Sequence, residues 1–262
     1  MRRMPRAAAL LVAGLALGAL AGCTAATPSR TPSPTVSGGA ATPSATAGPT
    51  SSAVPTASPS ASFDLQQHSI DDPRSIWVVV DKQRPLDPKS WVPQDLVAPD
   101  VPHTNAPLLR KPAAEALERM VAAAKRDGVG VVSLSAYRPY TVQKSIYDRN
   151  LASIGLAATD RLTARPGYSE HQTGLADDLG DSSGRCPIAT CFASTPAGRW
   201  LAADAWRYGW ILRYPAGEQS VTGIQSEPWH FRYVGTTLST YMHDTDQTLL
   251  ERVFGLPDSP DY

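Results

Sequence analysis

The sequence predicts an α+β fold, in which a small, largely antiparallel sheet has helices packed around it. Apolar residues recur at helical spacing in long segments near both ends of the region 63–262. Short runs rich in β-branched and aromatic residues cluster between these segments. Helical segments first and last, with short strands between them, are typical of the α+β class.

The first half of this region contains two expected helices and a strand. The first helix is expected over 111–127, where Pro112 suits the first turn and apolar positions form one face. The β-branched run 129–135 predicts a short buried strand. Thr141 can then cap a second helix that runs to about Ile154.

The second half supplies most of the expected sheet. We expect strands over 175–179, 210–214 and 229–234. A helix over 195–208 begins at a Thr-Pro pair and ends before a glycine. The apolar spacing of 236–254 predicts one final helix.

The first 22 residues have the pattern of an export signal. Three arginines precede an apolar run, Ala7–Ala21, that is shorter than the roughly 20 residues needed to span a bilayer. The run ends in Leu20-Ala21-Gly22-Cys23, a bacterial lipobox, which predicts that Cys23 carries diacylglycerol as the mature N-terminus. The alternative is an ordinary cleaved signal peptide in which Cys23 is incidental. We expect an extracytoplasmic protein attached to the membrane through this lipid anchor.

Residues 23–62 follow as the lipidated cysteine and a tether. Of the 39 residues after Cys23, 17 are Ser or Thr, seven are Pro and nine are Ala. Such a composition buries too little apolar surface to offset the cost of ordering, so we expect a disordered spacer.

The remaining residues, 63–262, are expected to form one catalytic domain and to act as a monomer. Four of the 24 basic residues and none of the 24 acidic residues precede residue 63, which leaves a net charge of −4. This balance gives no argument for a nucleic-acid partner or for a basic membrane-binding face. Cys186 and Cys191 lie five apart in the loop 182–195, and export favours a disulfide between them. The rival interpretation, a soft metal site, lacks a nearby histidine.

Two distant segments, Ser169–Asp178 and Glu227–Arg232, carry the chemistry. They offer two imidazoles, a carboxylate seven residues after the first, and a glutamate three residues before the second. This is the set of groups that a catalytic zinc site requires: three N or O ligands, an open position for water and a free carboxylate to activate that water. In an ideal strand, positions i and i+3 face opposite ways, so we expect Glu227 in a loop and His230 on a strand, with Pro228 marking the break.

The two segments, S-x-H-x-x-G-x-A-x-D and E-x-x-H, resemble the VanY-type zinc D-alanyl-D-alanine carboxypeptidases, grouped with L,D-carboxypeptidases and D-Ala-D-Ala dipeptidases. The resemblance covers roughly residues 76–236 and extends to further blocks at Val80–Leu86, Ser135–Tyr140, Tyr208–Pro215 and Glu227–Tyr233. The nearest departure is Asp177, where an apolar residue is expected; Asp81 and Asp177 are interpreted as structural.

The resemblance implies a role for each site residue. One Zn²⁺ per chain would be held by His171, Asp178 and His230, and Glu227 would be the general base. Arg138 of the Tyr-Arg block would stabilise negative charge on the scissile carbonyl oxygen.

Three further residues are expected near the substrate. Gln143 and Ser169 match family positions beside it, and Trp229, between Glu227 and His230, is a candidate pocket wall.

The expected function is removal of the terminal D-alanine from peptidoglycan stem peptides. A close alternative is L,D-carboxypeptidase activity on tetrapeptide stems, because the whole family shares the metal site. A non-catalytic wall-binding lipoprotein is an alternative of another class. It would require a lost ligand or base, and all four residues are present.

Overall fold

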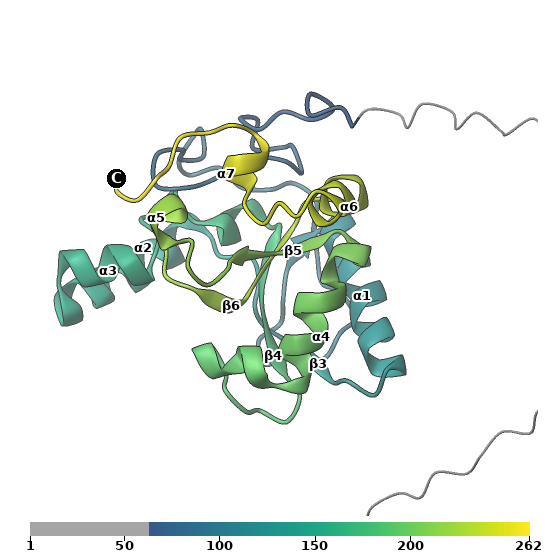
Figure 1. Cartoon of the computed structure of the whole chain (residues 1–262). Coiled ribbons are helices and arrows are strands. Elements are labelled where there is room, and N and C mark those ends of the chain that lie inside the picture. The colour runs from purple at the N-terminus through teal and green to yellow at the C-terminus, as the bar shows by residue number, and fades with distance from the viewer. Residues whose placement is uncertain (1–62) are drawn as a thin grey trace, which may run out of the picture. The chain divides into compact units, whose positions relative to one another are not determined.

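A computed structural model describes residues 63–262 of the chain, drawn in colour in Figure 1. The predicted signal peptide 1–22, the lipidation site Cys23 and the tether to residue 62 lie outside the described residues. Among the described residues, no helix has the length and apolar character needed to cross a membrane.

The elements alternate between short strands and helices of up to 16 residues. The strands are β1 (Leu96–Val97), β2 (Leu109–Arg110), β3 (Val131–Ser135), β4 (Ala176–Asp181), β5 (Trp210–Tyr214) and β6 (Glu227–Tyr233). The α-helices are α1 (Lys111–Arg126), α2 (Tyr140–Ile154), α3 (Leu156–Leu162), α4 (Pro196–Asp204), α5 (Gln219–Thr222), α6 (Thr236–Asp244) and α7 (Leu250–Val253). Three 3₁₀ helices are η1 (Glu170–Thr173), η2 (Thr190–Ser194) and η3 (Ala205–Tyr208).

Four strands form the central sheet in the order β3-β4-β6-β5, and every neighbouring pair is antiparallel. Helix α1 packs on β3, α4 on β4 and α6 on β5. Figure 1 shows α2 and α3 projecting from one end of the domain, away from the strands. The α+β prediction with a small antiparallel sheet is therefore confirmed.

One face of the sheet packs against the main hydrophobic core. Leu179 of β4 and Phe231 of β6 are fully buried there, together with Leu117 and Met120 from the apolar face of α1. Alternation along the strands turns Asp178 and His230 to the opposite face. Burial of one face thus fixes the register, and the register places the polar residues of the other face.

Three sequence expectations differ from the structure. Glu227 begins β6 instead of lying in a loop, and Pro228 falls where the β5–β6 register is irregular, a place where a strand tolerates proline. The expected helix 236–254 is two helices, because the chain leaves helical geometry after Asp244 and Asp246 has a φ of 54°. Helix α2 is preceded by Pro139 as its N-cap residue, so Thr141 lies within the first turn.

Candidate active site

The sheet brings Asp178 and His230 side by side. They are directly opposite one another on the antiparallel strands β4 and β6. Facing side chains of such a pair project from the same side of the sheet. As a result, Nδ1 of His230 lies 3.3 Å from Oδ1 of Asp178, and both residues are buried.

His171 reaches the same point from η1, the 3₁₀ helix before β4. Gly174 ends η1 with a φ of 67°, a left-handed conformation that glycine adopts without steric cost, and the chain then enters β4. Nδ1 of His171 lies 2.8 Å from the backbone carbonyl of Ala136, and Nε2 lies 3.4 Å from Oδ2 of Asp178. The carbonyl can only accept, so Nδ1 carries the hydrogen and Nε2 faces Asp178 with a free lone pair.

These three side chains could hold a metal ion. One ligand atom from each of His171, Asp178 and His230 lies within 4.8 Å of the other two. Oδ1 of Asp178 is buried and has no hydrogen-bond partner among the described residues. A buried carboxylate oxygen without a partner is costly, and a cation between the three ligand atoms would satisfy it.

The charges around the site also favour a bound cation. Burial opposes ionisation of Asp178, but the two imidazoles hold the pKa of its carboxyl well below the usual range. Burial alone would lower the pKa of His230, yet the nearby carboxylates of Asp178 and Glu170 raise it to about 9. Burial and the nearby Arg138 guanidinium lower the pKa of His171. The site thus stabilises an ionised carboxylate at Asp178 and a positive charge at His230.

Glu227 lies beside this group. Its Oε2 is 3.7 Å from Nδ1 of His230, and its side chain keeps 15% exposure to the cavity. Burial raises the pKa of Glu227 to about 7, and the positive charge of His230 opposes this effect. A carboxylate with a pKa near neutrality can take up and release a proton at neutral pH, as a general acid–base requires.

Arg138 lies beside Asp178 and is held by two side-chain hydrogen bonds. Its guanidinium donates to Oε1 of Gln143 at 2.9 Å and to Oγ of Ser135 at 3.0 Å, and it lies 3.8 Å from Oδ2 of Asp178. Gln143 in turn donates to the carbonyl of Ala164 at 2.6 Å. The structure therefore gives Gln143 a contact with Arg138, through which it orients the guanidinium.

All of these groups open into one cavity of about 310 Å³. The predicted substrate contacts Ser169 and Trp229 line it, together with Tyr214, whose ring centroid is 4.9 Å from that of His230. The cavity thus brings together every residue for which the sequence predicts a ligand, base or substrate role.

Sequence reasoning gave no role to Glu170, the residue before His171. Its fully buried carboxylate accepts from Nε2 of His230 at 3.2 Å, from Arg213 at 2.9 Å and from Arg232 at 2.8 Å. Burial would raise the pKa of Glu170, but the two guanidiniums hold it well below the usual range. An outer acceptor of this kind fixes the orientation and tautomer of a ligating imidazole. In the sequence, only the position of Glu170 next to the expected ligand His171 pointed to a role in the site, and the structure pairs Glu170 with His230 instead.

The two arginines that bond Glu170 are themselves held by residues near the beginning and the end of the described sequence. Arg213 donates to Glu251 of α7 at 3.0 Å, and Arg232 donates to the carbonyls of Ile76 and Val78 at 3.1 and 2.7 Å. Each guanidinium is fully buried and each has an acceptor besides Glu170.

The two aspartates interpreted as structural have structural contacts. Asp177 is fully buried and accepts from Oγ of Ser133 at 2.9 Å, and burial raises the pKa of its carboxyl well above the usual value. A neutral carboxyl in the core explains how an acid occupies a position where an apolar residue is expected. Asp81 accepts from the backbone N–H of Gln83 in a turn.

The chain is similar to a known family and to a curated relative. Residues 106–236 match the VanY family, described as D-alanyl-D-alanine carboxypeptidase. The chain is 39% identical to YodJ of Bacillus subtilis (strain 168) over 188 residues, which is 70% of this chain and 68% of YodJ.

Solved structures show the same likeness. A structure of the LdcB LD-carboxypeptidase has a TM-score of 0.66 and 39% sequence identity, and the likeness covers 71% of this chain and 88% of that one. A mutant of the D,D-pentapeptidase VanY from a VanB-type resistance cassette, in complex with Zn(II), has a TM-score of 0.56 and 30% identity, over 67% and 96% of the two chains. The chain therefore belongs to the VanY family of carboxypeptidases.

Proposed function

We propose that this protein is a zinc-dependent carboxypeptidase that removes the terminal D-alanine from peptidoglycan stem peptides. The observation that carries the proposal is the buried Asp178 carboxylate, which lies between the imidazoles of His171 and His230 with its Oδ1 lacking a hydrogen-bond partner, and which has Glu227 beside it. Ligand atoms around tetrahedral zinc, with bonds of about 2.1 Å, lie roughly 3.4 Å apart. Nδ1 of His230 lies 3.3 Å from Oδ1 of Asp178, and Nε2 of His171 lies 3.4 Å from Oδ2, so each imidazole nitrogen is at about this distance from one oxygen of the carboxylate.

The donor set supports zinc and an open position for water. His171, Asp178 and His230 supply nitrogen and oxygen atoms, the ligands that zinc accepts in catalytic sites, where three protein ligands leave one place free. When bound, zinc lowers the pKa of a coordinated water and polarises a carbonyl. The zinc-containing VanY structure, similar to this chain, agrees with the choice of metal.

Glu227 then performs both proton transfers. Its carboxylate removes a proton from the attacking water as the new C–O bond forms at the scissile carbonyl carbon. When the C–N bond breaks, the same carboxyl gives the proton to the amine of the departing D-alanine. A pKa of about 7 suits both directions of transfer near neutral pH.

Arg138 supports the same step by donating toward the carbonyl oxygen, where negative charge grows in the transition state. Gln143 and Ser135 hold its guanidinium in place before substrate arrives, so little reorganisation is needed.

A second candidate, L,D-carboxypeptidase activity on tetrapeptide stems, is favoured by one observation. The likeness to the LdcB LD-carboxypeptidase, at a TM-score of 0.66 and 39% identity, exceeds the likeness to the D,D-pentapeptidase VanY. Incubating the zinc-loaded protein with pentapeptide and tetrapeptide stems, and weighing the products by mass spectrometry, decides between the two. Loss of one alanine from the pentapeptide alone supports D,D activity, and loss from the tetrapeptide supports the alternative. If neither peptide is shortened, the proposal fails and the non-catalytic wall-binding alternative gains.

We further propose that the enzyme works outside the cytoplasm, held to the membrane by a lipid on Cys23. The lipobox and the export signal before it support this location. The Ser-, Thr- and Pro-rich residues that follow would let the catalytic domain reach a wall some distance from its anchor.

A further inference from the structure

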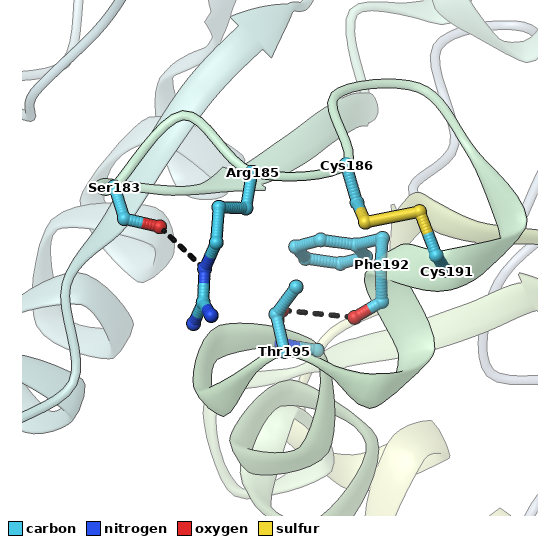
Figure 2. The surroundings of a disulfide bond; sticks show 7 residues. Ser183, Arg185, Cys186, Cys191, Phe192 and Thr195 are labelled. Carbon is cyan, nitrogen blue, oxygen red and sulfur yellow. Dashed lines mark hydrogen bonds between the residues drawn. A yellow bond between two sulfur atoms is a disulfide. The ribbon is translucent and has the colours of Figure 1, made fainter. Parts of the chain in front are cut away.

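The loop between β4 and α4, residues 182–195, forms part of the active-site cavity through a single apolar residue. We call it the disulfide loop, because Cys186 and Cys191 are bonded with their Cα atoms 5.6 Å apart, which confirms the pairing expected from the sequence (Figure 2). The bond closes a ring around residues 187–190. Ile188, inside this ring, lines the same cavity as His171 and Glu227.

Both ends of the loop are fixed to the body of the domain. At the start, the backbone N–H of Ser182 donates to the carbonyl of Gly130 at 3.0 Å, and Oδ2 of Asp181 on β4 accepts from the backbone N–H of Ala197 on α4 at 3.3 Å. At the end, Oγ1 of Thr195 donates to the carbonyl of Phe192 at 2.8 Å, and the Phe192 ring is fully buried beside the disulfide (Figure 2). With its ends anchored and its middle closed by a covalent bond, the loop presents its tip in one place.

The backbone at the tip is held in a conformation that its residues disfavour. Ile188 has a φ of 48° and Cys186 a φ of 56°. A β-branched residue with positive φ is a steric outlier, and such a residue persists where the surrounding structure over-determines it. The disulfide and the anchored ends provide that constraint, and the result is an isoleucine side chain that is 48% exposed.

Ile188 lies at the rim of the cavity, whereas the metal ligands lie at its floor. His171 and Asp178 are 5% and 6% exposed. A carboxypeptidase substrate ends inside the pocket, so only its amino-terminal part leaves through the mouth. A residue at the rim therefore meets the part of the peptide that precedes the scissile bond.

Ile188 is one of several apolar residues that line the cavity. Ile146, Leu162, Ile224 and Trp229 line the cavity with it. When a ligand covers exposed apolar side chains beside an active site with hydrocarbon, the burial of apolar surface makes the binding free energy more favourable. The aliphatic side chain of a stem-peptide residue is such a ligand group.

Resting on the proposed function, we propose that the disulfide loop is a specificity element. Ile188 packs against the aliphatic side chain of the third stem-peptide residue, which lies on the amino-terminal side of the scissile bond, and the Cys186–Cys191 bond holds Ile188 in position. The loop thereby selects stems with a long aliphatic third residue.

The test compares two stem peptides that differ only at the third residue, norleucine in one and glycine in the other. Norleucine supplies four aliphatic carbons without a charge. The measured quantity is the ratio of kcat/KM for the two peptides. In the parent protein the ratio should favour norleucine, and Ile188→Ala should reduce it by about tenfold, the effect of roughly two buried methylene groups. Ile154→Ala is the matched control, since Ile154 is 45% exposed at the end of α2 and, among the described residues, is not one that lines the cavity.

A second arm removes the disulfide. The Cys186→Ser/Cys191→Ser double variant should reduce the norleucine-to-glycine ratio in the same direction, because Ile188 is no longer held at the rim. An unchanged ratio in both Ile188→Ala and the double variant would overturn the inference. An equal loss of kcat/KM on both peptides would also overturn it, since the loop would then serve only the fold.

Binding measurements separate this inference from the proposed function. Calorimetric Kd values for the two peptides in the zinc-loaded Glu227→Gln background report affinity without turnover. If the parent cleaves neither peptide but Ile188→Ala still shifts the ratio of Kd values about tenfold, the inference stands and the proposed reaction fails. If the parent cleaves stems while both ratios are unmoved, only the inference fails.

Discussion

Replacing Glu170 by glutamine should weaken metal binding without removing a ligand. The Glu170 carboxylate accepts from Nε2 of His230, which leaves Nδ1 of that ring to face the metal. A glutamine side chain of the same shape offers one neutral oxygen in place of two charged ones. That oxygen must serve His230, Arg213 and Arg232 together.

Two costs follow, and they can be measured apart. Outer acceptors of metal-ligating histidines contribute typically 10- to 100-fold in metal affinity, about 1.4–2.8 kcal/mol at 1.4 kcal/mol per factor of ten. The neutral amide also leaves positive charge uncompensated at Arg213 and Arg232, and breaking a buried ion pair costs about 3–5 kcal/mol of folding stability. We expect a zinc Kd raised 10- to 100-fold and a lower Tm even without metal.

Zinc competition with a chromogenic chelator gives the Kd, and thermal unfolding of metal-free and zinc-loaded protein gives the stability. Glu251→Gln is the matched control, because Glu251 is equally buried and bonds Arg213, one step further from His230. It should lower the Tm while leaving the zinc Kd within about threefold. A Glu170→Gln protein with the parent's zinc affinity, or a control that loses as much affinity, would refute the assigned role.

The remaining predictions concern the chemistry and the anchor. Glu227→Gln should keep one zinc per chain by metal analysis but lower kcat by about 10²- to 10⁴-fold; loss of zinc would instead make Glu227 a ligand. Because the base acts as a carboxylate and burial raises its pKa to about 7, kcat/KM should rise with pH toward that value. Bound zinc adds positive charge that lowers the pKa of Glu227, so the rise in kcat/KM should occur at a lower pH in the zinc-loaded enzyme. A pH–rate profile flat from about pH 4 to 8 would contradict the assignment. Arg138→Lys should lower kcat about tenfold or more in steady-state kinetics with zinc content unchanged, and a change confined to KM would mark Arg138 as a ground-state contact. Cys23→Ser should move the protein from the membrane to the soluble fraction on cell fractionation, and continued membrane association would exclude Cys23 as the anchor.

The sequence was sufficient to predict the groups at the centre of the site. The spacing of His171, Asp178 and His230 matches a known pattern, and local signals predicted the two strands that carry Asp178 and His230, which pair in the structure. The position of Glu227 was predicted on the wrong element, because the ideal two-residue alternation of a strand does not hold where the β5–β6 register is irregular.

Glu170 and Ile188 could not be assigned from the sequence for a different reason. The role of Glu170 depends on two arginines, 43 and 62 residues further along, whose approach only the folded sheet reveals. Ile188 stands in a short polar loop where nothing local predicts contact with the cavity. Both roles arise from long-range packing, which single-sequence patterns do not encode.

The arginines around Glu170 bear on where this protein can be cut. A fragment of residues 106–236, the part that matches the family, keeps every proposed ligand and the base. It nevertheless discards Glu251 and the carbonyls of Ile76 and Val78, so Arg213 and Arg232 would each lose partners in a buried setting. Such a fragment should express poorly or bind zinc weakly, whereas a truncation that begins at residue 63 and retains α7 preserves these contacts. Boundaries for expression are therefore better drawn from the charge network than from the extent of sequence similarity.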